Sequence, residues 1–173
     1  MDISETELAW VAGFLDADGS ISIRKQERGT VSPRYFIVVQ ASNRDKIALE
    51  RLANCFGGKV FRVKQSIDRA HYSDCYHWHI ASQKAARCLR ETMPYLLIKR
   101  DQAINALKLQ ECIDQGNKGY GQQALSQWEV QQREKLYQII RNLNQKGKPH
   151  HRAQQEARLR MEEKPLFIQL NFL

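Results

Sequence analysis

The stretch LAWVAGFLDADGS, from Leu8 to Ser20, decides the fold expected for this chain. Its first ten residues predict a helix without an ordinary polar face, because bulky apolar side chains such as Val11 and Leu15 occupy one side. The opposite side carries small residues and one acid: Ala9, Ala12, Gly13, Asp16 and Ala17. A helix that is apolar all round is usually buried all round, so the two faces are expected to meet different partners.

Small residues recur at Ala9, Gly13 and Ala17, which places them one above another on the helix. Such a stripe removes the side chains that keep two backbones apart, so another helix can approach closely. The helix ends at DADG, which brings Asp16 and Asp18 to its C-terminus. Because a helix C-terminus carries partial negative charge, acids there need a nearby cation, and a metal ion is the natural candidate.

The composition of the chain favours an anionic partner. Its 173 residues suffice for one domain, with or without an appendage, and 42% of them are hydrophobic. The net charge of +8 is typical of proteins that bind nucleic acid, and a basic surface without such a role is the alternative. No apolar run has membrane-spanning length, and acids at Asp2, Glu5 and Glu7 argue against a signal peptide. The four cysteines include no CxxC pair, so we expect an intracellular protein with reduced thiols.

Periodic patterns predict the remaining elements of the core. Strands at Ser20–Glu27 and Arg34–Ser42 form a hairpin around a turn at Gly29–Pro33, and a second helix ends at Gly57-Gly58. The later elements are strands at Lys59–Ser66 and Cys75–Ala81 and helices at Ser82–Met93 and Lys99–Gln115. No strand–helix–strand series implies a parallel sheet. We therefore expect an α+β domain with one antiparallel sheet covered by helices on one face.

The same patterns assign side chains to faces. Phe61 and Val63 are expected to point into the core, and Ile47 is expected in the buried stripe of the second helix. The uncovered sheet face carries mostly polar and basic residues: Ser22, Arg24, Gln26, Arg28, Arg34, Phe36, Val38, Gln40, Arg62, Lys64, Ser66, His77 and His79. A solvated face normally mixes charges, but this one has almost no acids, so a nucleic-acid platform is favoured over plain exposure. A two-stranded ribbon can enter the major groove, where Arg and Gln read guanine and adenine edges.

The C-terminal part differs in character, so we divide the chain into a core at residues 1–121 and a helical, basic extension at 122–173. Ser126–Asn144 predicts an amphipathic helix, and Lys146–Arg160 is strongly basic. The chain closes on PLFIQLNFL, which either docks on a partner surface or adds an edge strand; the sequence leaves both open.

The motif LAWVAGFLDADGS is similar to the signature of the LAGLIDADG homing endonucleases. The order of elements and the YLLIKRDQA segment at Tyr95–Ala103 also resemble that family, and the resemblance covers Glu5–Gln115. It implies an αββαββα fold with a saddle-shaped, four-stranded antiparallel sheet, followed here by C-terminal helices. Only one copy of the motif is found, which implies the single-motif subclass that works as a homodimer.

The resemblance also implies roles for particular residues. The motif helices of two subunits would pack together through Ala9, Ala12, Gly13 and Asp16. Asp18 would bind the catalytic divalent metal, with the carbonyl of Ala17 as a further ligand. Asn43 falls where the family often has a Gln that orders water, and Lys99 falls on its basic active-site position. The shorter Asn43 departs from the usual Gln.

Each role has a plainer alternative. In this alternative, Asp16 would only cap or brace a helix end, Lys99 would be an ordinary lysine in the first turn of a helix, and Asn43 would be only part of the cap of the second helix. For His77 and His79, a base contact, a phosphate contact or plain exposure is favoured over a zinc site, because alternation along a strand supplies no second ligand pair.

The function implied is a homing endonuclease that hydrolyses both strands of a long pseudo-palindromic double-stranded DNA site. Mg²⁺ is the expected cofactor, Mn²⁺ is expected to substitute for it, and intron RNA is a further candidate partner. The location implied is a chloroplast, a mitochondrion or a bacterial cytoplasm. Two alternatives stay open: a non-cleaving binder of the same fold (an intron maturase or a transcription-factor-like protein), and a basic structural dimer without nucleic acid.

Overall fold

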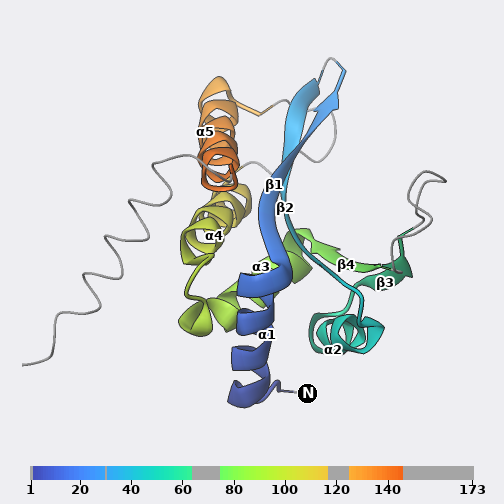
Figure 1. The fold of residues 1–173 in the computed structure, drawn as a ribbon. Helices are drawn as coiled ribbons and strands as arrows, with labels where there is room; N and C mark the ends of the chain where they lie inside the picture. Colours follow the sequence, from blue (N-terminus) through green and yellow to red (C-terminus); the bar gives the residue numbers. More distant parts are fainter. Residues whose placement is uncertain (1, 30, 64–74, 117–124, 146–173) are drawn as a thin grey trace, which may run out of the picture.

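The computed structural model describes residues 2–29, 31–63, 75–116 and 125–145. These residues form one four-stranded antiparallel sheet in the order β1-β2-β4-β3, together with helices that bury one of its faces (Figure 1). The expected α+β class with one antiparallel sheet is confirmed. Among the described residues, no helix combines the length and the apolar character that crossing a membrane requires.

Helix α1 spans Glu5–Asp18 and ends within the DADG sequence, as predicted. Ser4 Oγ accepts a hydrogen bond from the Glu7 N–H at 3.3 Å, which caps the first turn. At the other end, a Cβ on Gly19 would lie 2.6 Å from the Leu15 carbonyl oxygen, so only glycine fits where β1 leaves the helix. The close approach of β1 to the last turn of α1 therefore fixes the exit of the chain.

One residue of the small face of α1 was assigned to the wrong side. Ala9, Gly13 and Ala17 are exposed, but Ala12 is fully buried in the core with Val11 and Leu15. Residues three apart on a helix lie on the same face, and Ala12 precedes Leu15 by three positions. Ala12 therefore packs within its own chain and is not on the exposed stripe.

Strands β1, Gly19–Arg28, and β2, Val31–Asn43, form a hairpin longer than expected. The turn predicted over Gly29–Pro33 is wrong, because β2 already begins at Val31 and a register shift between Gln26 and Arg28 absorbs the irregularity. The assignment of faces holds, with Ile21, Ile23, Tyr35, Ile37, Val39 and Ala41 all buried against the helices.

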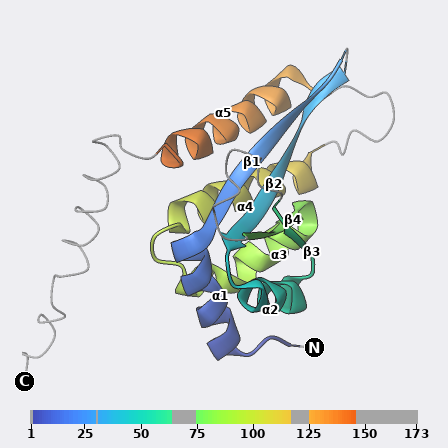
Figure 2. The same cartoon turned by 45° about the vertical axis from the view of Figure 1, so that its right-hand side comes forward.

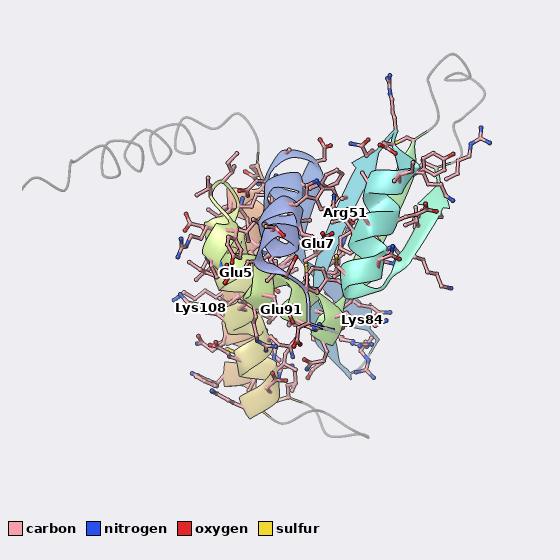
Figure 3. All side chains as sticks on the ribbon, turned by 90° about the horizontal axis from the view of Figure 1, so that it is seen from below. Glu5, Glu7, Arg51, Lys84, Glu91 and Lys108 are labelled. Atoms are coloured by element: carbon pink, nitrogen blue, oxygen red, sulfur yellow. The ribbon has the colours of Figure 1, made fainter. Side chains whose placement is uncertain are left out.

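Helix α2, Lys46–Phe56, packs through Leu49, Leu52 and Phe56. The expectation that Ile47 is buried is wrong: its side chain is 75% exposed, because it lies in the first turn, on the solvent side of the stripe that the core covers. Arg51 on α2 makes two hydrogen bonds to Glu7 on α1, at 2.6 and 2.7 Å, and joins the two helices (Figure 3).

In the third strand, the residues that face the core and those that face away are exchanged relative to the prediction. In β3, Lys59–Arg62, Val60 lies opposite Trp78 of β4, Tyr76–Ala81, while Phe61 lies opposite His77. Phe61 and Val63 are 44% and 37% exposed, so their predicted inward direction is wrong. Because side chains alternate along a strand, a shift of one residue exchanges the two faces.

The remaining helices complete the covered face: α3 at Ser82–Thr92, the 3₁₀ helix η2 at Met93–Tyr95, α4 at Arg100–Gln115 and α5 at Gln127–Leu143. Helix α5 packs along α4 and β1, and its Ile140 is 1% exposed within the same core as α1 and the sheet (Figure 2). The described part of the predicted extension therefore shares one core with α1, the sheet, α2, α3 and α4.

Candidate active site

The end of α1 and the end of β2 meet at Asp18. The exposed Asp18 carboxylate accepts a hydrogen bond from Asn43 Nδ2, with 2.6 Å between Nδ2 and Oδ2. Asn43 Oδ1 in turn accepts the Asp45 N–H at 2.8 Å, just before the cap of α2. The Asn43 amide is thus held from both ends, so it fixes the direction of the Asp18 carboxylate and also belongs to the turn before α2.

The second acid of the motif has a different role. The Asp16 carboxylate accepts hydrogen bonds from the backbone N–H groups of Leu97, Ile98 and Lys99, at 2.7, 3.1 and 2.8 Å. This carboxylate braces the segment that leads into α4, which matches the plainer alternative given for Asp16. It is committed to backbone groups of its own chain.

Lys99 lies at the C-terminal end of α1. Its Nζ donates hydrogen bonds to the backbone carbonyls of Leu15, at 2.9 Å, and Asp16. A cation in this place offsets the partial negative charge of the helix end. The sequence suggested a metal ion for this compensation; within the described residues, the Lys99 ammonium provides it. Asp18, Asn43 and Lys99 therefore converge from three elements on one helix end.

The oxygen ligands at this helix end are of the type that a hard divalent cation prefers, but one chain supplies too few of them. Carboxylate and carbonyl oxygens are the ligands that Mg²⁺ prefers, and Asp18 and the carbonyl of Ala17 are of that kind. Within the described residues, no three His, Cys, Asp or Glu side chains are placed to hold a metal ion. A single chain contributes the Asp18 carboxylate, so a complete site needs oxygen ligands from elsewhere.

The uncovered face of the sheet adjoins this site. Arg24, Gln26, Arg28 and Arg34 are exposed on it, and Ser22, Phe36 and Gln40 are half-buried. None of the described strand residues that face this side is acidic. By contrast, the helical side carries both signs, with Glu5 and Glu91 among Lys84 and Lys108 (Figure 3). The uncovered face is therefore the basic surface of the molecule that the sequence predicted.

Some of the residues assigned to this face are placed elsewhere. Arg62 lies opposite Tyr76, on the same side of β3 as the core-facing Val60, so its assignment to the uncovered face is wrong. Val38 is only 8% exposed and offers little contact surface. Lys64 and Ser66 lie outside the described residues.

Two residues of the uncovered face were missed: Lys59 and Phe61, which lie opposite His79 and His77. Assigning the odd-numbered residues of β3 to the uncovered face, instead of the even-numbered ones, would have identified both. The Phe61 ring is 5.3 Å from the His77 ring and 5.9 Å from the His79 ring, so the three aromatic side chains form one cluster. Burial, and then the neighbouring His79, lower the pKa of His77, and its Nδ1 shares a 2.7 Å hydrogen bond with Ser42 Oγ.

Besides the exposed stripe, the end of α1 carries a second exposed apolar feature that the sequence did not reveal. Apart from the backbone of its own helix, a Cβ added to Gly13 would meet nothing within 4 Å among the described residues, so their packing does not require glycine there. Leu97 and Ile98, 71% and 53% exposed, are held at the end of the same helix by Asp16. Leu97 and Ile98 are thus exposed beside the last turn of α1, where their backbone N–H groups bond to Asp16.

Comparisons with known proteins agree on one family. A family model described as LAGLIDADG endonuclease matches residues 11–91. The homing endonuclease I-CvuI in complex with its target, in the presence of Ca, is 20% identical with a TM-score of 0.64, over 83% of this chain and 85% of that chain. A second I-CvuI complex was solved in the presence of Mg.

Two further solved structures have similar folds. The archaeal intron-encoded homing endonuclease I-Vdi141I, complexed with DNA, is 14% identical with a TM-score of 0.65, over 88% of this chain and 96% of that chain. The LAGLIDADG homing endonuclease I-SmaMI, bound to cleaved DNA, is 17% identical with a TM-score of 0.57, over 90% of this chain but 49% of that chain. The search of curated proteins found no match.

Proposed function

The chain belongs to the LAGLIDADG endonuclease family, and from this premise we propose that it is a site-specific endonuclease acting on double-stranded DNA. The observation that carries the proposal is the position of Asp18, an exposed carboxylate held by Asn43 where the basic, acid-free sheet face begins. A nucleic acid bound to that face would bring its phosphates to this carboxylate.

The shape and chemistry of the uncovered face support duplex DNA as the substrate. The β1–β2 hairpin is a two-stranded ribbon, which the major groove admits. Its exposed Arg24, Gln26, Arg28 and Arg34 are of the types that pair with guanine and adenine edges or with phosphates. The complexes of I-CvuI and I-Vdi141I were solved with a target and with DNA, respectively.

We also propose that the active form is a homodimer. One chain supplies a single carboxylate, whereas cutting two strands needs two such centres. Pairing of two α1 helices through Ala9, Gly13 and Ala17 would bring both copies of Asp18 to the dimer axis. Leu97 and Ile98 would then be covered at the edge of the same contact.

The residues of the site would act together on a scissile phosphate. Asp18 and the Ala17 carbonyl would hold Mg²⁺, which when bound activates water and neutralises charge on the phosphate and the leaving oxygen. Asn43 keeps the Asp18 carboxylate in one direction. Lys99 adds positive charge at the helix end and reduces the repulsion between a phosphate and the helix dipole.

The test is selection of cleavage sites from a randomised duplex library with Mg²⁺. We expect enrichment of one long sequence in which the two halves are related by an approximate dyad, with both strands cut. Binding of such a site without cleavage under Mg²⁺ or Mn²⁺ would favour the non-cleaving alternative. Enrichment of no sequence at all would overturn the proposal.

A further inference from the structure

The far part of the β1–β2 hairpin has no neighbouring strand. Strand β4 pairs with β2 only from Val38 to Asn43, so the described residues of 24–36, called here the hairpin arm, pair only with each other. A hairpin of two strands alone is at best marginally stable in water. Yet the arm presents Arg24, Gln26 and Arg34 on the uncovered face, and reading bases requires these side chains to be held in place.

Helix α5 lies along the opposite face of the arm and is tied to the hairpin at three levels (Figure 2). Before its N-terminus, the Leu125 N–H donates to Ser32 Oγ at 3.1 Å, near the tip. After its C-terminus, Asn144 Nδ2 donates to the Ile21 carbonyl at 2.9 Å, near the base. The third connection is Glu134, in the middle of the helix.

Glu134 gathers the polar contacts between α5 and the arm. Its Oε2 accepts a 2.5 Å hydrogen bond from the Tyr35 hydroxyl and lies 3.2 Å from Lys25 Nζ. Its Oε1 accepts from Gln138 Nε2 at 2.7 Å, and the Tyr137 ring lies 6.1 Å from the Tyr35 ring. Burial raises the pKa of Tyr35 to about 12, so the hydroxyl keeps its proton and remains a donor at neutral pH.

Lys25 and Tyr35 are paired in register, and their neighbours along the strands, Arg24 and Gln26 among them, point to the uncovered face. A contact on one face therefore fixes the strand segment that carries the side chains of the other face. We propose that Glu134 is a positioning residue for sequence readout: it touches no DNA, but through Tyr35 and Lys25 it holds the arm in its reading position. The inference rests on the proposed DNA-cleaving function.

The geometry also says which base pairs depend on this contact. Arg24 is five positions beyond Gly19 along β1, which at about 3.3 Å per residue is roughly 16 Å, or about five base pairs. Loss of the contact of Glu134 with Tyr35 and Lys25 should therefore weaken base selection at the outer positions of each half-site. The base pairs near the cut, which would face Ser22, Gln40 and His77, should be selected as strongly as before.

The test compares Tyr35→Phe, Glu134→Ala and the double variant with the wild type. Tyr35→Phe keeps the buried ring and removes only the hydroxyl. Binding selection is performed on duplex libraries randomised at outer or at inner half-site positions, and hydrogen exchange of the arm amides is measured without DNA. The matched control is Ile140→Val, which loosens the core packing of α5 and leaves the Glu134 contacts in place.

We expect each single variant to lose about tenfold discrimination at outer positions and to change inner positions less than about twofold. The double variant should lose no more than the worse single variant, because the two residues act through one contact. Exchange of the arm amides should be faster in the variants than in the control.

Unchanged outer selectivity in both single variants, or an equal loss at inner and outer positions, would overturn the inference while leaving the proposed function intact. So would a loss as large in Ile140→Val. If the wild type itself selects no sequence, the proposed function fails, and the inference about readout falls with it; the exchange data then report only on the stability of the arm.

Discussion

Asp16 and Lys99 bond to each other's backbone in both directions. The Asp16 carboxylate accepts the Lys99 N–H at 2.8 Å, and Lys99 Nζ donates to the Asp16 carbonyl. The end of α1 and the start of α4 are therefore one unit, although the two residues are 83 positions apart in the chain. Asp18, the residue proposed to bind metal, projects from this unit.

Asp18→Asn is expected to abolish cleavage and to retain binding. The amide has nearly the same shape but no charge, so a divalent cation loses its carboxylate ligand while the fold persists. We expect the cleavage rate in Mg²⁺ to fall by at least about a hundredfold, with the affinity for the selected site, measured in Ca²⁺, within about threefold. A variant that still cuts at the wild-type rate would refute the metal assignment.

Asp16→Ala is expected to destabilise the fold. The substitution leaves three backbone N–H groups without their charged acceptor, and we expect the free energy of unfolding in urea to fall by about 1–3 kcal/mol. Glu50→Gln is the matched control, since it removes an exposed ion pair with Lys46 on α2. An equal, small effect of both substitutions would show that the brace contributes little.

Two substitutions of Gly13 distinguish the stability of a single chain from the formation of a dimer. The methyl group of Gly13→Ala would meet no described residue beyond its own helix, and the change removes a helix-interior glycine, so a monomer should gain about 0.5–1 kcal/mol. Gly13→Arg should keep the circular dichroism spectrum but give a monomer without cleavage activity in sedimentation equilibrium and nuclease assays. A Gly13→Arg protein that remains dimeric would place the interface elsewhere.

Lys59 and Arg62 provide a matched pair on β3. Lys59 faces the uncovered side and Arg62 the covered side, so Lys59→Ala should weaken DNA binding and reduce the salt dependence by about one counterion. Arg62→Ala should leave both quantities within error. Fluorescence anisotropy over a series of salt concentrations measures the slope. If Arg62→Ala weakened binding and Lys59→Ala did not, Arg62 would face the DNA, as the sequence predicted.

His77 is expected to make the folded state sensitive to mild acid. Burial, followed by the charge of His79, lowers its pKa below the ordinary value of 6.5, so the folded protein binds its proton less tightly than the unfolded chain does. Stability should therefore fall as pH drops below about 6.5, and the decline should end below the folded pKa. Urea unfolding of the wild type and His77→Gln between pH 5 and pH 7.5 tests this, because the variant should lose that part of the pH dependence. In the wild type, an NMR titration midpoint for His77 above 6.5 would contradict the direction.

Much of the fold could be predicted because its signals are local. A Ser4 cap, an alternation of Ile21 and Ile23 with polar residues, and a glycine pair after α2 each act within a few residues. The phase of β3 could not be predicted, since alternation is the same in either phase. Gly57 and Gly58 have φ of 72° and 98°, and the Trp78 indole donates to the Gly57 carbonyl at 2.8 Å, so a distant strand fixes how the chain enters β3.

The sequence by itself determined the α+β class, the buried faces of β1, β2 and β4, and the basic face, because period and charge are properties of each segment. It also placed Asp18 at the end of α1. Only the tertiary structure decided that Asn43 holds Asp18, that Lys99 provides the cation at that helix end, and that Glu134 braces the hairpin. These contacts join residues 25, 84 and 99 positions apart, and no local pattern encodes which side chains the packed core brings together.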